Sequence, residues 1–284
     1  MKKLINLTLI YFFAVSIVAA QHVEIGVGGG FSAYNGDLSP TDKAYSYGDA
    51  RYTLMGFIRY HHNDYITIKG SLTGGRLSAD DRKSKLAHKR ERNLHFKSVF
   101  GEAAITAEWN ILGYEPRFLT KVFTPYVFVG IGMVGFNPQA NINGQWVDLQ
   151  SRRTEGQGLP QFPDRQPYKK FAFSFPVGAG IKYAISDRIN IGGEVGLRRT
   201  TTDYIDDVST TYVADEILEQ YVGPHAPVAA NRTGGPVETG QSRGNPNVND
   251  YFIVGVVTVS YNIIDSGLSG GRKKRRRSIG CPTF

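Results

Sequence analysis

The feature that most constrains this chain is a strict alternation of large apolar side chains with small or charged ones. The run from Phe171 to Tyr183 shows it most clearly. Its odd positions are Phe171, Phe173, Phe175, Val177, Ala179, Ile181 and Tyr183, and its even positions are Ala172, Ser174, Pro176, Gly178, Gly180 and Lys182. Successive side chains of a β-strand point to opposite faces, so this period of two predicts a strand with one wholly apolar face.

Eight segments of the chain are candidate strands of this kind. They lie near residues 22–33, 50–61, 64–75, 94–109, 123–136, 171–183, 188–200 and 250–262. The fourth and fifth fit either phase of the alternation. Their lengths suit the roughly 9 to 11 residues that a tilted strand needs to cross a bilayer, and exceed the usual strand of about 5 to 6.

The connections between these segments run alternately long and short. Outer-membrane barrels have this pattern, because their periplasmic turns are tight and their extracellular loops are long. A sheet in lipid must also close on itself, since an open edge would leave backbone N–H and C=O groups without partners. The sequence therefore predicts an all-β fold: an eight-stranded antiparallel transmembrane β-barrel with long extracellular loops and a periplasmic C-terminal tail. An even number of strands places both termini on the periplasmic side.

The competing fold is a soluble barrel, such as a lipocalin-like ligand carrier, which keeps its large apolar groups inside. The small face of the predicted strands carries Glu24, Arg51, Arg59, Lys69, Lys182, Glu194 and Arg198. So many charges do not fit the dry core of a ligand carrier, whereas they suit an internal network of ion pairs. If a membrane barrel had this charged face outward instead, each Lys or Arg at the bilayer midplane would cost about 2 to 4 kcal/mol. Because side chains fill an eight-stranded barrel, we expect no open pore.

The first 20 residues have the features of a secretory signal. Lys2 and Lys3 precede an apolar run from Leu4 to Val18, and small residues lead to a cleavage site after Ala20. The competing interpretation is an uncleaved membrane anchor. Since residue 21 is a glutamine, the cleaved chain would have no cysteine there for lipid attachment.

Most of the formal net charge of +8 lies at the two ends of the chain. The signal holds two lysines, and the tail, residues 263–284, has a balance of +5. Its six basic residues are Arg272, Lys273, Lys274, Arg275, Arg276 and Arg277. The barrel, residues 21–262, is therefore nearly neutral, and nucleic acid is a poor partner for an exported chain. The basic block is expected to bind an acidic protein face or anionic head groups, or else to be a solvated, disordered tail.

Cys281 is the only cysteine of the chain and follows the basic block. In an oxidising compartment it can form a disulfide only with another molecule. The alternative is a free thiol. The candidate partner-binding residues are thus the six basic residues of the tail and Cys281.

Two loops carry notable charge. The connection from Arg76 to Asn93 holds seven basic and three acidic residues, which either pair with lipid phosphates or remain solvated. The connection from Thr201 to Asn249 holds Asp203, Asp206 and Asp207. Their carboxylates either bind calcium or accept hydrogen bonds within the loop, and the spacing of an EF-hand is absent.

The sequence contains no H-E-x-x-H motif and no phosphate-binding glycine motif. The glycines from Gly26 to Gly30 lie within an alternating strand, where close packing in a narrow barrel explains them. His61 and His62 fall at a predicted tight turn, where turn or interfacial roles are favoured over metal binding. We therefore expect no enzymatic activity and no cofactor. The remaining catalytic alternative is a lipid A-modifying barrel with loop-borne His and Ser residues.

Three segments together resemble a known family. They are Tyr34-Asn35-Gly36-Asp37-Leu38-Ser39-Pro40, Pro125-Tyr126-Val127-Phe128-Val129-Gly130-Ile131-Gly132 and Thr202-Asp203-Tyr204-Ile205-Asp206-Asp207-Val208-Ser209. With them the chain resembles the PorG family, small OmpA-like outer-membrane barrels of the type IX secretion system. The resemblance implies a non-enzymatic component that anchors the periplasmic ring of PorK and PorN type proteins to the outer membrane. That machinery exports proteins with a C-terminal sorting domain and, in gliding bacteria, adhesins.

Two functions therefore stand side by side. In the first, the barrel lies in outer-membrane lipid, and its periplasmic turns and tail hold the secretion ring. In the second, the protein is an OmpA-like adhesin or ligand-binding barrel that uses the loops around residues 138–170 and 201–249.

Overall fold

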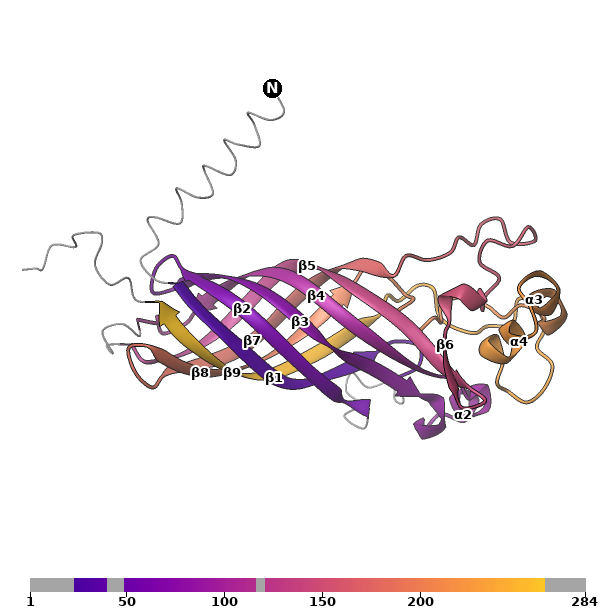
Figure 1. Cartoon of the computed structure of the whole chain (residues 1–284), viewed down its shortest axis with the longest axis horizontal. Helices are drawn as coiled ribbons and strands as arrows, with labels where there is room; N and C mark the ends of the chain where they lie inside the picture. Colours follow the sequence, from indigo (N-terminus) through magenta and orange to yellow (C-terminus); the bar gives the residue numbers. More distant parts are fainter. Residues whose placement is uncertain (1–22, 40–48, 116–120, 264–284) are drawn as a thin grey trace, which may run out of the picture.

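The strands of the chain form one closed β-barrel (Figure 1). The computed structural model describes residues 23–39, 49–115 and 121–263, so the predicted signal peptide lies outside the described residues. The barrel strands are β1 (Val23–Asn35), β2 (Arg51–His61), β3 (Ile66–Asp80), β4 (His95–Asn110), β5 (Phe123–Ile142), β7 (Phe171–Ala184), β8 (Ile189–Thr200) and β9 (Tyr251–Ile263). Every neighbouring pair is antiparallel, and the pairing of β1 with β9 closes the ring. The predicted fold, an eight-stranded antiparallel barrel, is confirmed.

The alternation places large apolar groups outside and small or charged groups inside. In β7, Phe173 is 62% exposed, whereas Ser174 is fully buried. The structure also settles the two ambiguous strands. On β4, Ile105 faces outward and Glu108 inward, and on β5, Val129 faces outward while Phe128 is buried.

The outer wall is an apolar band with aromatic side chains near both rims. The outward row of β7 runs from Phe171 to Tyr183, and at about 3.3 Å per residue and a tilt of about 40° it spans roughly 30 Å of height. Exposed aromatic residues nearest the tight turns are Tyr65, Trp109, Phe123, Tyr183 and Tyr261, and those nearest the long loops are Tyr52, Trp146, Phe171 and Phe173. This is the outer face of a membrane barrel, since a soluble barrel of this size would not expose such a band to water.

Glycines on the inner face make room for rings from β5. A Cβ added at Gly178 or Gly196 would lie 2.6 Å from the Phe128 ring, and one at Gly180 would lie 2.6 Å from the Tyr126 ring. In β1, a Cβ at Gly26 would lie 2.4 Å from the Phe57 ring. Close packing, as predicted, therefore explains the small residues of these strands.

The two ends of the barrel differ. Val23 pairs with Ile263 beside the tight turns that join β2 to β3 and β7 to β8. The opposite end carries β6 (Gln145–Asp148), η2 (Asp81–Lys83), η4 (Gln150–Arg152) and three short helices (Figure 1). These helices are α2 (Ala87–Arg92), α3 (Asp215–Tyr221) and α4 (His225–Ala230). Within the described part of the chain, no helix has the length and hydropathy to cross a membrane.

The strand boundaries were predicted closely except at this loop end. β3 continues to Asp80 and β5 continues to Ile142, where it turns back into β6. The outward-facing residues of these extensions, such as Arg76 and Asn137, are polar, because the extensions lie beyond the apolar band and need no lipid-facing row.

Candidate functional site: the packed lumen and its loop cap

A charged network fills the half of the lumen nearest the tight turns. At its centre, the Arg59 guanidinium donates to Glu24 Oε1 at 2.7 Å and to Glu108 Oε1 at 3.2 Å. A third carboxylate, Glu194, lies 3.6 Å from the same side chain. Arg59 and Glu194 are 2% and 3% exposed, so these charges are paired with one another in place of water.

Two lysines balance the remaining charge of this network. Lys69 Nζ lies 2.6 Å from Glu194 Oε2, and Lys182 Nζ lies 2.5 Å from Glu108 Oε2. The Tyr126 hydroxyl donates to Glu194 at 2.7 Å. Three carboxylates therefore face three cations in the lumen, in the internal ion-pair network that the sequence predicts. We call this set the charged network: Glu24, Arg59, Lys69, Glu108, Tyr126, Lys182 and Glu194.

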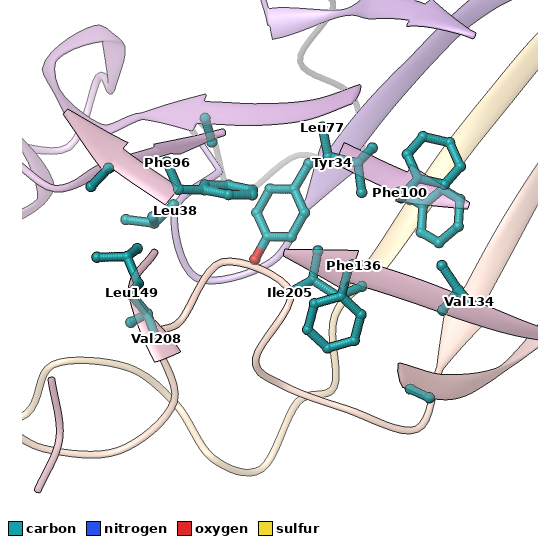
Figure 2. Close-up of a cluster of buried hydrophobic side chains, with 14 of the residues drawn as sticks. Tyr34, Leu38, Leu77, Phe96, Phe100, Val134, Phe136, Leu149, Ile205 and Val208 are labelled. Carbon is teal, nitrogen blue, oxygen red and sulfur yellow. The ribbon is translucent and has the colours of Figure 1, made fainter. Parts of the chain in front are cut away.

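The loop half of the lumen is apolar. Above the charged network lies Arg198, 3.5 Å from Glu102, and beyond it a cluster of buried side chains fills the barrel (Figure 2). The cluster contains Leu77, Phe96, Phe100, Val134 and Phe136 from the strands, joined by Leu149, Ile205 and Val208 from the loops. The loops thus plug the mouth of the barrel with apolar groups of their own.

The plugging loops form a folded unit, here called the loop cap, residues 149–168 and 201–250. Its first anchor is Asp206, which accepts hydrogen bonds from the Tyr34 hydroxyl at 2.7 Å and from the Leu38 N–H at 3.1 Å. Asp250 lies 2.5 Å from the same hydroxyl and accepts from the Ile205 N–H at 2.9 Å. Two segments of the family resemblance, after β1 and after β8, therefore meet at the mouth of the barrel.

The second anchor of the loop cap is Glu155, which is fully buried. Its carboxylate accepts from the Ser209 N–H at 2.9 Å, from the Thr210 hydroxyl at 2.7 Å and from Arg243 Nη1 at 2.9 Å. Arg243 also lies 3.6 Å from Asp207, which accepts from the Tyr168 hydroxyl at 2.7 Å. Loops far apart in the sequence are thus joined through one buried ion pair.

Two carboxyl groups of the loop cap, those of Asp206 and Asp207, have raised pKa values and therefore keep their protons to a higher pH than usual. Burial, together with the nearby Asp37 charge, raises the pKa of Asp206 to about 8, and burial raises that of Asp207 to about 6. The geometry gives the reason for Asp206 and Asp250. The single proton of the Tyr34 hydroxyl serves only one of the two carboxylates, so the second contact requires a protonated carboxyl.

This arrangement makes the loop cap pH-dependent. The folded pKa of Asp206 lies above its ordinary value of 3.8, so its contribution to stability is complete below about pH 4 and is lost as the pH rises toward about 8. Limited proteolysis of residues 201–249 is therefore expected to be slowest at pH 5 and faster at pH 8.5, after correction with an unfolded substrate. Asp206→Asn should flatten the profile and the exposed control Asp164→Asn should not. A pH-independent cleavage rate in the unmodified protein would contradict this origin of the cap's stability.

The predicted site residues fall in different places. Arg272 to Arg277 and Cys281 lie outside the described residues. Asp206 and Asp207 are hydrogen-bonded within the loops, the second of the two interpretations offered for them. In the part of the chain that the structure describes, no group of three or more His, Cys, Asp or Glu side chains is arranged to hold a metal ion.

Two predictions about individual residues are wrong. Arg51 is exposed at the rim and donates to the Ser78 hydroxyl, because it begins β2 beyond the packed lumen. His61 does not lie in the turn. It ends β2 inside the barrel, where its two ring nitrogens lie 2.9 Å from Glu24 Oε2 and 2.9 Å from Thr67 Oγ1. His62 is exposed and does lie in the turn, where its backbone N–H donates to the Ile66 carbonyl.

The chain is similar to one family model and to several solved structures. The model of the family DUF6089, a domain of unknown function, matches residues 2–219. No curated protein matches the chain. Solved structures that resemble it include the attachment invasion locus protein Ail of Yersinia pestis in complex with a heparin analogue (TM-score 0.40, 11% identity, 85% of this chain and 97% of that chain). Others are the N-terminal barrel domain of Pseudomonas aeruginosa OprF (0.35, 12%, 85% and 97%) and Neisserial surface protein A (0.40, 7%, 85% and 96%).

Proposed function

The chain belongs to the DUF6089 family, a domain of unknown function, and we propose that it is a sealed outer-membrane barrel that anchors a periplasmic protein assembly. The observation that carries this proposal is the occupied lumen. The charged network fills one half of the barrel, and the apolar cluster and loop cap fill the other. A barrel filled in this way serves as a membrane anchor, and its working parts are the two ends.

The end with the tight turns is proposed to face the periplasm. Val23 and Ile263 pair at that end, so the segments before and after the barrel begin there. The proposed layout is a signal peptide in residues 1–20, the barrel in residues 21–262 and a periplasmic tail in residues 263–284. The tail would then present Arg272 to Arg277 to a partner beneath the membrane.

The assembly we propose is the periplasmic ring of the type IX secretion system, built of PorK and PorN type proteins. The support comes from the segments that resemble the PorG family. The contact between Tyr34 and Asp206 joins two of those segments, and Tyr126 of the third is part of the charged network. These residues stabilise the barrel and its cap, which gives the matching segments a structural role. Binding of the ring is assigned to the tail. Export and gliding motility would follow from that attachment.

The experiment is mild crosslinking in cells that produce the full chain, followed by purification and identification of bound proteins. The proposal expects PorK and PorN type ring subunits. Replacing Arg275, Arg276 and Arg277 with glutamine should reduce their recovery, whereas the matched control with glutamine at exposed Lys85, Arg90 and Lys169 of the loop end should not. Recovery of monomer and lipid alone, or equal loss in both variants, would contradict the anchoring role.

Cys281 gives a covalent test of the same attachment. If the thiol is paired with a cysteine of a ring subunit, a higher-mass band is expected on non-reducing gels and is lost on reduction and in Cys281→Ser. Because the chain has one cysteine, no internal disulfide can produce such a shift. A monomer band under both conditions would remove the covalent link, while the crosslinking experiment would still report on the contact.

A second candidate function is a surface adhesin or ligand-binding barrel. It is favoured by apolar side chains on the loop cap outside the membrane band, since Tyr221 is 44% exposed and Val248 is 54% exposed. Replacing Tyr221, Val228 and Val248 with serine should abolish surface binding and spare protein export under this function. The anchoring role predicts no effect of these changes on export or on ring attachment.

A further inference from the structure

The outer wall carries a cluster of cations and aromatic rings at the loop end, here called the outer-wall patch. It contains Tyr52 on β2, Arg76 on β3, Lys97 on β4 and Trp146 on β6. Lys97 Nζ lies 3.5 Å from the centre of the Trp146 ring, and the Arg76 guanidinium lies 5.4 Å from the centre of the Tyr52 ring. The four side chains line one hollow, whose other charged or titratable residues are Asp49, Arg51, Asp80, Arg82, Lys83 and His95. The patch is thus a concave surface and not a row of separate charges.

The two cations of the patch lack acidic partners. The two carboxylates of the hollow are already paired, Asp80 with Arg82 and Asp49 with Lys83. Among the described residues, by contrast, neither Arg76 nor Lys97 forms an ion pair. The register pairs Arg76 with Val99 and Ser78 with Lys97, so the two cations are diagonal neighbours on the same outer face. Adjacent like charges repel, and an anion bound between them would relieve that repulsion.

The patch lies at the edge of the apolar band that is nearest the long loops. On the outer face, Tyr52 is the neighbour of Leu54 toward the loop end of β2, and Lys97 is the neighbour of Val99 toward the loop end of β4. Leu54 and Val99 are 66% and 59% exposed and belong to the band. An anion held by the patch would therefore sit where the hydrocarbon region gives way to head groups.

An apolar groove lies on the outer wall between the patch and the tight turns, and it shares β2, β3 and β4 with the patch. Its walls include Ile58, Leu72, Ile105 and Met133, and its floor includes Gly56 and Gly70. A Cβ added at either glycine would meet no atom within 4 Å, so the missing side chains leave open space on the lipid face. Leu72 and Arg76 are four residues apart on β3, which is about 13 Å along the strand. The groove and the cations are thus within the reach of one lipid molecule.

We propose that the outer-wall patch and this groove bind a single lipid with a phosphorylated head group, of the diphosphorylated glycolipid type. The phosphate lies between Arg76 and Lys97, where charge-assisted hydrogen bonds replace the missing carboxylates. Tyr52 and Trp146 flank the head group, and an acyl chain lies in the groove past Leu72. A lipid fits better than a soluble anion because Tyr52 and Lys97 of the hollow adjoin Leu54 and Val99 of the apolar band. The site does not depend on the anchoring role, since it lies on the wall and not at the turn end.

Native mass spectrometry of the full-length barrel tests this site. The probes are diphosphorylated lipid A, monophosphorylated lipid A, phosphatidylethanolamine and inorganic pyrophosphate. We expect one tightly retained diphosphorylated lipid, with retention about tenfold or more weaker in Arg76→Gln/Lys97→Gln. The matched control is Lys169→Gln/Arg199→Gln, which removes two exposed cations at the loop end near β7 and β8 and should bind normally. Equal retention by both double variants would overturn the proposal.

A second variant separates the groove from the charges. Gly70→Leu adds a side chain where the structure leaves open space, so the barrel should fold while the groove is filled. We expect weaker retention of the diphosphorylated lipid in this variant and unchanged weak binding of pyrophosphate. The lipid assignment would be overturned if pyrophosphate bound as tightly as the lipid and its binding were unaffected by Gly70→Leu. The site would then be one for soluble anions.

Discussion

Replacing Arg59 with alanine is expected to lower the free energy of unfolding by about 3 to 5 kcal/mol, because it leaves buried carboxylates without their shared cation. Arg59 contacts Glu24 at 2.7 Å and Glu108 at 3.2 Å, and no described side chain is positioned to replace it at both. Lys69 and Lys182 would remain, so the network would carry one uncompensated negative charge in the lumen.

The measurement is a urea titration in lipid vesicles, followed by the fluorescence of the two tryptophans. Arg199→Ala is the matched control, because Arg199 lies on the outer face of β8 and is exposed. It should change the free energy of unfolding by less than about 1 kcal/mol. Equal effects of the two substitutions would show that the charged network does not hold the barrel together.

The second large effect is expected from Glu155→Gln in the loop cap. The substitution removes the charge that pairs with buried Arg243 and turns an amide N–H₂ toward N–H donors of the loop, such as that of Thr210. Arg243 would keep its hydrogen bonds to the Asp207 and Ala230 carbonyls, but its one remaining carboxylate partner would be Asp207 at 3.6 Å. The loss of the closer carboxylate should cost about 3 kcal/mol, which corresponds to about a hundredfold increase in cap opening. The barrel itself should remain folded, since the strands make no use of Glu155.

Limited proteolysis within residues 201–249 measures this opening, and heat-modifiable migration on gels checks the barrel. Glu219→Gln is the matched control, because Glu219 lies on the exposed face of α3. Cleavage that is unchanged in Glu155→Gln would mean that the cap is held by its apolar contacts alone. Loss of the folded barrel in the same variant would mean that cap and barrel do not open separately.

The strands of this protein are predictable because lipid and lumen impose opposite demands on alternate residues. In β7, the outward residues from Phe171 to Tyr183 are large and apolar except for Ala179, and the inward residues are small apart from Pro176 and the charged Lys182. β4 is harder, since small Ala103 faces outward and small Ala104 inward. Glu102, Thr106 and Glu108 all occupy even-numbered positions. They indicate that the even-numbered face of β4 points inward, because two acidic residues cannot face lipid.

The loop cap could not be predicted because its contacts join segments far apart in the chain. Glu155 meets Ser209 and Arg243, and Tyr34 meets Asp206, with no spacing rule that connects them. The same holds for His61, whose neighbour Glu24 lies on the adjacent strand β1. The outer-wall patch likewise needs the turn of β5 into β6, which brings Trp146 over Lys97.

In a sealed membrane barrel, the odd-numbered row of β5 faces lipid and its even-numbered row faces a packed lumen. Adjacent positions test it most directly: Val129→Trp and Phe128→Trp, each in a Trp109→Phe/Trp146→Phe background and reconstituted in vesicles of lipid brominated in mid-chain. Val129 is 61% exposed and Phe128 is 3% exposed, so we predict strong quenching of the tryptophan at 129 and little at 128. Equal quenching at both positions, or stronger quenching at 128, would contradict a sealed barrel with its apolar face in lipid.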